Sequence, residues 1–572
     1  NAQYNLSKVQ SQQEDAMERL ASGLRINSAA DDAAGVAIAS RLTAEIKGTN
    51  MAIRNAMDAQ ALIDTADGAL KESHSLLIRM RELAVQAQNG TLATADVSAL
   101  GVEFDALESE IDRISTSTTW GGKEILDGSF STGTELNIDV GSASPITHLI
   151  KDLDAADQEA LVKQSFSGKS GQIAWLSGDN LWIGWNGKHG LQTLGSLPFK
   201  LPGGFYRCES ELEEIDLIGW GLGSYQFDRY KKQDRSPSIL VASKSKKLQR
   251  ALEAIDSTYL ARDLINTPSQ DMSPADFEKV TKRVAKQFSA KVSVIRGDAL
   301  LKSGCGAIHA VGRAAEVPPR LIELTWGNKK NPTIAIVGKG VTFDSGGLNI
   351  KPGGSMRQMK KDMGGAAIAL GLAKLVMRRE LPIHLKLLIP LAENAISGNA
   401  FRPGDILQTH KGITVEIDNT DAEGRLLLCD ALSISLGYKP ELIIDFATLT
   451  GAARVAVGTE ISAMFCTNAE DIQALMASGD NQDDPVWPLP LHEGYEYMLA
   501  SNVADVTNSA PGGYAGATTA ALFLKRFVDT TPWIHFDIMA FNTRARPARP
   551  EGGEAMGMRA TYEFLERRYG HS

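Results

Sequence analysis

The sequence changes character near residue 145, and this change limits the possible folds more than any other feature. Before that point the chain contains one tryptophan, Trp120, and no cysteine, whereas the other seven tryptophans and all four cysteines come after it. The first part is rich in alanine, serine and charged residues, and the second mixes short apolar runs with helical patterns. A length of 572 residues allows about three or four domains. We therefore expect a domain boundary near residue 145.

The first part carries a heptad pattern. Large apolar residues recur every seven positions, and alanines continue the seam; these residues are Ala56, Ile63, Leu70, Leu77 and Ala84. Such spacing favours a long helix that packs against partner helices. The pattern predicts one helix from about residue 30 to residue 88, where Asn-Gly ends it, and a second from about 95 to 115. The first part, 1–145, is therefore expected to be α-helical.

Charge and composition argue against several classes of partner. The formal net charge is −10, the pI is near 5.6 and the basic residues are dispersed, so we expect no nucleic-acid surface. No run approaches the roughly 18 apolar residues of a membrane span, and the first residues are polar where a signal peptide is apolar. The cysteines lie far apart without a C-x-x-C pair, which favours buried thiols in a reducing compartment: Cys208, Cys305, Cys429 and Cys466.

The second part alternates strand-like and helical segments, as an α/β architecture requires. Residues 171–241 contain aromatic, glycine-rich pieces that predict a small sheet with helices, and a linker helix is expected at about 244–264. Further on, the apolar run Ile334–Val337 predicts a buried strand that continues into a glycine-rich loop. That loop lacks both the G-x-x-x-x-G-K-[ST] and the G-x-G-x-x-G spacing, so nucleotide binding is disfavoured. A helix is expected to begin near Asp362.

The segment "NTDAEGRLLLCDAL" at 419–432 places three charges before an apolar helix. In a helix Asp421 and Arg425 would share a face and Glu423 would not, whereas in an extended segment all three point to one side. The spacing therefore suits a loop that gathers charge on one surface. Capping of the following helix by its acids is the alternative explanation.

Several charged residues follow predicted strands and so are expected at one edge of the sheet. They are Lys339, Asp344, Asp421, Glu423 and, with a hydroxyl, Thr448. With Asp362, four carboxylates at one buried site would repel unless cations offset their charge. An oxygen-rich set without clustered histidines suits Mg²⁺, Mn²⁺ or Zn²⁺, and four carboxylates are enough to bridge two ions. An H-E-x-x-H zinc site is absent from the sequence.

Three segments of the second part resemble the signature segments of the leucyl (cytosol) aminopeptidase family, with the separations expected between them. They are "VGKGVTFDSGGLNIKP" at 337–352, "KDMGGAA" at 361–367 and "NTDAEGRLLLCDAL" at 419–432. The resemblance covers about residues 150–572. It implies a two-domain α/β metallopeptidase with a mixed central sheet, in which 150–243 form the small domain and 244–572 the catalytic domain.

The same resemblance implies a set of metal ligands. Asp344, Asp421 and Glu423 would hold one ion, and Lys339, Asp344, Asp362 and Glu423 would hold the other, so that Asp344 and Glu423 bridge. The ions would be Zn²⁺ or Mn²⁺, with Mg²⁺ also possible. A lysine ligand must be neutral, and two adjacent cations together with burial would lower its pKa.

Further residues receive catalytic and binding roles from the resemblance. Lys351 would stabilise the oxyanion, and Arg425 would hold a bicarbonate that accepts a proton from the attacking water. Met359, Thr448 and Gly451 would line the pocket for the first side chain, with a preference for leucine or methionine. The expected reaction is the release of N-terminal residues from peptides by a homohexamer assembled through its catalytic domains.

The first part closely resembles the N-terminal helical region of bacterial flagellins over about residues 1–145. Three segments carry the resemblance: "ERLASGLRINSAADDAAGVAIASRL" at 18–42, "RMRELAVQAQNGT" at 79–91 and "EIDRISTSTTWGGKEILDGS" at 110–129. It implies contacts with other flagellin helices, and Arg79 and Leu83 would contact the innate flagellin receptor. Residues 540–572 do not resemble the returning flagellin helix. The chain begins with asparagine, which suggests truncation, processing or an engineered junction.

Three hypotheses for the whole chain follow. The favoured one is an active aminopeptidase that carries a flagellin-like segment, whether the fusion is natural or constructed. The alternative is a flagellar filament protein whose outer domain has an enzyme fold, and a third, an inactive scaffold, is disfavoured because all seven site positions keep family-compatible residues. The peptidase part indicates a cytoplasmic protein, whereas the flagellin-like segment indicates export to the flagellum.

Overall fold

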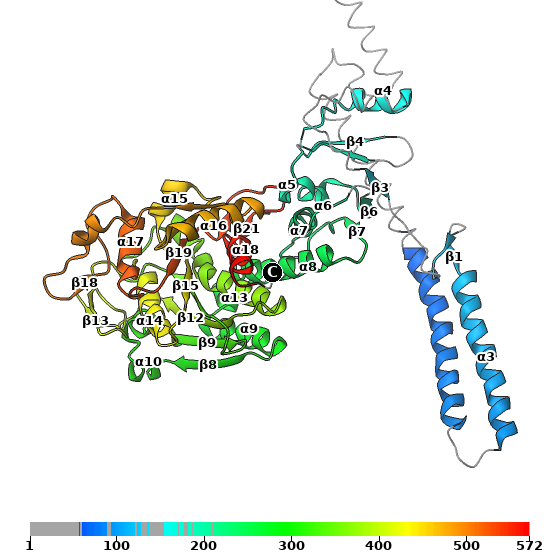
Figure 1. The fold of residues 1–572 in the computed structure, drawn as a ribbon, viewed down its shortest axis with the longest axis horizontal. Helices are drawn as coiled ribbons and strands as arrows, with labels where there is room; N and C mark the ends of the chain where they lie inside the picture. The colour runs from blue at the N-terminus through cyan, green and yellow to red at the C-terminus, as the bar shows by residue number, and fades with distance from the viewer. Residues whose placement is uncertain are drawn as a thin grey trace, which may run out of the picture. The chain divides into compact units, whose positions relative to one another are not determined.

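The computed structural model describes most of the chain beyond residue 210 and shorter stretches before it. The described residues are Met57, 60–87, 93–120, 123–126, 134–137, 154–169, 171–176, 181–185, 187–208 and 211–570. The chain divides into two compact units, Asn1–Thr132 and Gly133–Ser572. We describe each unit by itself (Figure 1). No helix in the described part is long and apolar enough to cross a membrane.

The described part of the first unit is a pair of helices followed by a small hairpin. One helix covers 60–87, and the second, α3 (Thr94–Ser117), lies beside it (Figure 1). The bounds of α3 agree with the helix predicted at 95–115. Strands β1 (Thr119–Trp120) and β2 (Lys123–Glu124) pair antiparallel. The beginning of the long predicted helix and the Asn-Gly break at 89–90 lie outside the described residues.

The helix pair packs through side chains outside the predicted seam. Leu83 and Ile114 are buried, and Arg79 forms an ion pair of 2.9 Å with Glu103 on the other helix. The seam residues are exposed, at 61% for Ile63 and 54% for both Leu70 and Leu77, and Ala56 lies outside the described residues. Packing of the heptad seam against a partner helix therefore stays a prediction.

The second unit begins with a five-stranded sheet in the order β4-β5-β3-β6-β7. Only the β4–β5 pair is antiparallel. The strands are β3 (Thr134–Asn137), β4 (Ile173–Trp175), β5 (Leu181–Ile183), β6 (Phe205–Cys208) and β7 (Ile239–Val241). The helices are α4 (Ala155–Lys163), α5 (Leu191–Leu194), α6 (Leu197–Lys200) and α7 (Glu214–Gly223). The middle strand, β3, lies before the change of composition at residue 145, in a segment that the sequence assigned to the helical part.

The larger sheet has nine strands, ordered β17-β16-β19-β15-β10-β12-β9-β8, with β11 paired to β12. Its central pairs β12–β10, β10–β15 and β15–β19 are parallel, whereas β8–β9, β9–β12 and β16–β19 are antiparallel. This confirms the predicted mixed central sheet. The strands are β8 (Lys291–Arg296), β9 (Arg320–Trp326), β10 (Thr333–Gly338), β11 (Gly340–Asp344), β12 (His384–Asn394), β15 (Leu442–Ala447), β16 (Ser462–Cys466), β17 (Val486–Pro488) and β19 (Trp533–Asp537).

Helices cover both faces of this sheet, because its central strands are apolar on both sides. In β10, Ile334 and Ile336 belong to one core cluster and Ala335 and Val337 to the other. The first cluster includes residues of α8 (Lys246–Asn266), α9 (Pro274–Gln287), α13 (Gly364–Arg378), α16 (Ala469–Asn481) and α18 (Met558–Tyr569). The second includes residues of α10 (Ala299–Lys302), α11 (Gly306–Gly312), α14 (Gly424–Leu436), α15 (Gly451–Val457) and α17 (Gly516–Lys525).

Short elements complete the unit. They are α12 (Gly353–Met356), the 3₁₀ turns η3 (Ser269–Asp271), η4 (Met359–Met363) and η5 (Glu493–Leu499), and strands β13 (Ile406–Gln408), β14 (Thr414–Glu416), β18 (Val506–Thr507), β20 (Phe541–Asn542) and β21 (Gly552–Gly553). The linker helix expected at 244–264 is α8. Of the four cysteines, Cys305 and Cys429 are buried, and Cys208 and Cys466 are half-buried.

Candidate metal centre

Three neighbouring strand ends place functional side chains at one edge of the central sheet. Lys339 directly follows β10, Asp344 ends β11 and Thr448 follows β15. The backbone N–H of Lys339 donates to the carbonyl of Phe446 at 2.9 Å, which extends the β10–β15 pairing to the site. The strand-end prediction therefore holds for these three residues. It was wrong for Asp421 and Glu423, because the strand before them, β14, belongs to a separate three-stranded sheet, β13-β14-β18.

Glycines allow the helices to approach these strand ends closely. A Cβ on Gly365 at the start of α13 would lie 2.0 Å from the carbonyl oxygen of Phe446, and a Cβ on Gly338 would lie 2.6 Å from the Cα of Ala366. A Cβ on Gly424, the first residue of α14, would lie 2.4 Å from the Cε of Lys339. Both helices can begin beside the site because no side chain intervenes.

Carboxylates and lysine ammonium groups lie next to one another in the candidate metal centre. Ligand atoms of Asp344, Asp421 and Glu423 all lie within 4.8 Å of one another. The Lys339 ammonium lies 2.8 Å from Asp362 and 3.0 Å from Glu423, and it donates to the carbonyl of Thr448 at 2.8 Å. The structure thus brings together all five residues that the sequence proposed as metal ligands.

Lys351 contacts the other side of the acidic cluster. Its ammonium lies 2.8 Å from Asp344 and also pairs with Asp421. Lys351 follows the loop after β11, and its backbone N–H donates to the carbonyl of Ser345 at 2.9 Å, so the loop folds back to present it. The two lysines of the centre therefore divide the carboxylates between them.

Burial and mutual repulsion shift the pKa values of the acids upward. Burial, followed by repulsion from Asp344, raises the pKa of Glu423 to about 8 and that of Asp421 to about 6. For Lys339, burial favours the neutral amine, but Asp362, Glu423 and Asp344 outweigh it and raise the pKa above its ordinary value. The Lys339 and Lys351 ammonium groups therefore neutralise the negative charge of the four carboxylates only in part.

Three buried carboxylate oxygens of the cluster have no hydrogen-bond partner among the described residues; Asp362 Oδ2 and Asp421 Oδ1 lie against lysine ammonium groups, which leaves a third. It is Oε2 of Glu423, a side chain that is 1% exposed. A buried carboxylate oxygen without a partner is costly, and a cation is the partner that carboxylates accept best in an oxygen-rich site. The donor set, with four carboxylates and one amine, therefore fits divalent cations.

Arg425 borders a separate hollow of about 260 Å³. Its Nη1 donates to the carbonyl of Asn508 at 2.7 Å, whereas its Nε is buried without a partner in the described part of the chain. Burial lowers the pKa of Arg425 to about 10. Asp421 and Gly451 line the same hollow, whereas Glu423 is not among its lining residues. Arg425 lies in the first turn of α14 and Glu423 already has helical backbone angles, so the prediction of an extended segment with all three charges on one side was wrong.

Of the three residues expected in the substrate pocket, Met359 and Thr448 adjoin Asp362, and Gly451 lines the hollow that Asp421 and Arg425 share. Met359 begins η4, three residues before Asp362, and Gly451 begins α15. The hydroxyl of Thr448 donates to Asp362 Oδ1 at 2.7 Å. The structure places them beside the acidic cluster, while their contacts with a substrate stay a prediction.

Two polar residues that support the site were not identified from the sequence. Asn394, at the end of β12, donates to Asp344 Oδ1 at 2.8 Å and to the carbonyl of Thr420 at 3.1 Å. Asp537, at the end of β19, accepts from the N–H groups of Leu449 and Thr450 at 3.1 and 3.0 Å. Each follows an apolar strand at its carboxyl end, which is the signal that could have identified them.

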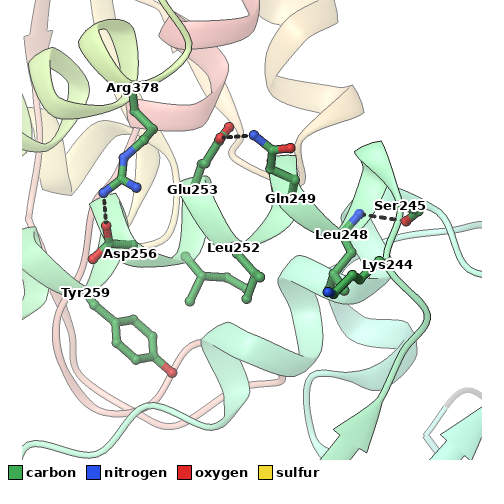
Figure 2. Close-up of a pocket in the computed structure, with 10 residues that line it drawn as sticks. Lys244, Ser245, Leu248, Gln249, Leu252, Glu253, Asp256, Tyr259 and Arg378 are labelled. Atoms are coloured by element: carbon green, nitrogen blue, oxygen red, sulfur yellow. Dashed lines mark hydrogen bonds and ion pairs between the residues drawn. The ribbon is translucent and has the colours of Figure 1, made fainter. Parts of the chain in front are cut away.

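A larger hollow, of about 870 Å³, lies along α8 and away from the acidic cluster (Figure 2). Figure 2 shows Arg378 paired with Asp256 and Gln249 bound to Glu253 across this surface. Leu252, which is 55% exposed, forms its apolar floor. The described residues of this hollow include no group of metal ligands, so we assign the chemistry to the smaller site.

Family models match three parts of the chain. Residues 259–562 match the cytosol aminopeptidase family, catalytic domain, and residues 147–242 match the M17 aminopeptidase, N-terminal domain. Residues 1–131 match the bacterial flagellin N-terminal helical region.

Known proteins and solved structures resemble the second unit. The probable cytosol aminopeptidase of Geobacter sp. (strain M21) is 40% identical over 372 residues, which cover 62% of this chain and 75% of that protein. The probable cytosol aminopeptidase 1 of Shewanella oneidensis is 39% identical, over 61% and 71% of the two chains. The structure of the cytosol aminopeptidase from Coxiella burnetii has a TM-score of 0.73 at 43% identity and covers 77% of this chain and 98% of its own. The bottromycin maturation enzyme BotP in complex with Mn has a TM-score of 0.68 at 30% identity, over 76% and 100%.

Proposed function

The chain belongs to the cytosol aminopeptidase family, and on that premise we propose that it releases the first residue of peptides at a centre of two divalent cations. The carrying observation is the cluster of Asp344, Asp421 and Glu423 within 4.8 Å, with an unpartnered Glu423 oxygen. The family is metal-dependent, and one relative has been solved with Mn. The further details below are part of this proposal.

The ligands divide as the family resemblance implies. Asp344, Asp421 and Glu423 would hold one ion, and Lys339, Asp344, Asp362 and Glu423 would hold the other. Zn²⁺ or Mn²⁺, or less favourably Mg²⁺, would supply positive charge at the scissile carbonyl and lower the pKa of the attacking water. Thr448 orients Asp362 through its 2.7 Å hydrogen bond, and Asn394 orients Asp344.

Two cationic side chains complete the chemistry. Lys351, already directed at Asp344 and Asp421, donates a hydrogen bond to the carbonyl oxygen as negative charge develops on it. Arg425 binds a bicarbonate through its unpartnered Nε, in the 260 Å³ hollow that it shares with Asp421. A bicarbonate held there by Arg425 would supply an acceptor for the proton of the attacking water.

The first side chain of the substrate lies against Met359, Thr448 and Gly451. The Met359 side chain and the methyl of Thr448 are apolar surfaces, and Gly451 leaves space beside them. Leucine and methionine are therefore proposed as preferred first residues. We also propose the homohexamer that the family resemblance implies, with catalytic domains at its centre.

Chelation tests this function. Protein stripped with a strong chelator should lose hydrolysis of leucine p-nitroanilide and recover it with Mn²⁺ or Zn²⁺, while circular dichroism shows that the fold is kept. Full activity in protein shown to be metal-free by elemental analysis would contradict the proposal.

A second function is supported by the first unit alone. Residues 1–131 match the flagellin region, and Ile63, Leu70 and Leu77 form an exposed apolar line to which other flagellin helices could bind. On this alternative the chain is a filament protein and is exported. Arg79 is exposed and Leu83 is buried, so contact with the innate flagellin receptor would involve Arg79 first. Negative-stain microscopy of the purified chain separates filaments from compact hexamers.

A further inference from the structure

The hollow beside the metal centre is lined by an exposed aromatic side chain that the reaction described above does not use. Tyr514 lines this hollow of about 260 Å³ together with Asp421 and Arg425, and it is 87% exposed. Within residues 211–570, which the structure describes without a gap, the Tyr514 side chain has no hydrogen bond, ion pair or ring contact. Its aromatic ring is therefore free to contact a ligand in the hollow.

The chain before Tyr514 is tied to the loop that enters α14. The Asn508 side chain accepts hydrogen bonds from the N–H groups of Asp418 and Asn419 at 2.8 and 3.1 Å, and it donates to the Asn419 carbonyl at 2.7 Å. The Ser509 hydroxyl donates to Asp418 at 2.5 Å. Because that loop carries two of the proposed metal ligands, the chain that leads to Tyr514 keeps a fixed position beside the acidic cluster.

The tip of this segment makes little contact with the rest of the second unit. Cβ atoms on Gly512 and Gly513 would meet no atom within 4 Å, and Gly512 has a φ of 83°, a conformation that favours glycine. Packing resumes at Gly516, the first residue of α17, where a Cβ would lie 3.2 Å from that of Ala452. The ring of Tyr514 is therefore carried by an open tip between two anchored ends.

The hollow offers a peptide a course beyond the scissile bond. Of the three residues proposed to contact the first side chain, only Gly451 lines the hollow, whereas Met359 and Thr448 do not. Asp421 belongs both to the acidic cluster and to the hollow, so the two adjoin. With its first side chain against Met359 and Thr448 and its carbonyl at the cluster, a peptide would extend its next residue into the hollow, toward Tyr514.

We propose that Tyr514 binds the side chain of the residue that follows the scissile bond, and that the enzyme prefers peptides whose second residue is aromatic. This inference rests on the proposed aminopeptidase function and adds a second specificity position to it. An exposed aromatic ring buries a large apolar area when it packs against another ring, and such pairs favour offset or edge-to-face geometry. Tyrosine has few rotatable bonds, so little conformational entropy is lost on contact.

Two dipeptides with the same first residue test the inference. Leucyl-phenylalanine and leucyl-glycine differ only in the second side chain, and the release of leucine is measured for both by amino-acid analysis. The ratio of kcat/KM for the phenylalanine peptide to that for the glycine peptide should be about ten or more in the intact enzyme. Tyr514→Ala should lower this ratio at least about threefold, chiefly through a higher KM for leucyl-phenylalanine, while Tyr514→Phe should retain it.

Tyr497→Ala is the matched control, because Tyr497 is also an exposed tyrosine, at 73%, but does not line the hollow. It should change the ratio less than about twofold. A ratio of one or less in the intact enzyme would overturn the inference, as would a ratio that Tyr514→Ala leaves unchanged or that Tyr514→Phe abolishes. Leucine amide has no second side chain and is the reference: absence of its hydrolysis with any divalent ion would contradict the proposed function itself.

Discussion

Lys339 and Lys351 are both lysines of one acidic cluster, yet their contacts assign them different tasks. Lys339 is 2% exposed and is enclosed by Asp362, Glu423 and the Thr448 carbonyl. Lys351 reaches the cluster from the loop after β11 and is more accessible. An enclosed side chain such as Lys339 suits a metal ligand, whereas a more accessible one such as Lys351 suits a group that must contact the substrate.

Lys351→Ala should therefore keep both ions and lose turnover. Loss of one donor to a developing oxyanion costs roughly 10²–10³-fold in kcat. Lys339→Ala should instead lose an ion. Elemental analysis together with steady-state kinetics checks both variants, and metal loss in Lys351→Ala with metal retention in Lys339→Ala would reverse the assignment.

Asp344, proposed to bind both ions, should matter more for metal content than Asp421, proposed to bind one. Asp344→Ala would remove the side chain proposed to bind both ions and would leave Asn394 with the Thr420 carbonyl as its remaining acceptor. Asp421→Ala would remove a ligand proposed for one ion only. We expect fewer than one ion per chain in the first variant and about one in the second, as measured by elemental analysis. An equal loss of one ion in both would show that Asp344 does not bridge.

Metal binding to chelated protein should release protons at neutral pH. The pKa of Glu423 is raised from its ordinary 4.5 to about 8, so below pH 8 this side chain holds a proton that an ion must displace. Metal affinity should fall as the pH is lowered from 8 to 6. Calorimetry in two buffers of different ionisation enthalpy measures the released protons, and a pH-independent affinity without proton release would contradict the raised pKa.

At the scale of single residues, the sequence predicted which ligands meet but not what supports them. Lys339, Asp344 and Thr448 could be placed together because each follows a buried strand, and strand ends share one edge of a sheet. Asn394 and Asp537 occupy equivalent positions, but single polar residues after a strand carry no distinctive spacing.

Among the elements, η4 and α13 show how a helix start is adapted to a site. A helix was expected to begin near Asp362, whereas the chain forms a 3₁₀ turn over Met359–Met363 and begins α13 at Gly364. The two glycines at 364 and 365 allow contact with the ends of β15 and with Ala540. The positions of helix and strand segments were predicted well, while this tight packing was not, because it depends on distances between elements far apart in the sequence.

Gly424 at the start of α14 is the glycine at which an added side chain would most disturb the candidate metal centre. A Cβ there would lie 2.4 Å from Cε and 2.7 Å from Nζ of Lys339. Gly424→Ala should therefore displace the lysine and lose an ion, as Lys339→Ala does, while α14 still forms. Gly398→Ala is the control, since its Cβ would meet no atom within 4 Å. Metal content and thermal unfolding measure the two effects, and a fully loaded Gly424→Ala would show that Lys339 is not confined there.

For the whole molecule, the two compact units predict that the chemistry is independent of the first one. The proposed ligands, catalytic groups and pocket residues lie between Lys339 and Gly451, inside the second unit. Deletion of residues 1–132 should leave kcat within about twofold of the intact chain. A loss of more than about tenfold, or roughly 1.4 kcal/mol in the activation barrier, would show that the helical unit takes part in the peptidase.

The deletion must end before β3, because this strand belongs to the five-stranded sheet of the second unit. Strand β3 (Thr134–Asn137) lies between β5 and β6 and is parallel to both, so the chain that leaves the first unit enters the second through the middle of a sheet. Deleting 1–145 would remove this strand and leave two edges unpaired. The same arrangement has a mechanical consequence: tension applied to the helical unit would act along β3 and shear its hydrogen bonds on both sides together. The two units are therefore joined through a central strand of the small sheet, and a force on one unit would reach the folded interior of the other.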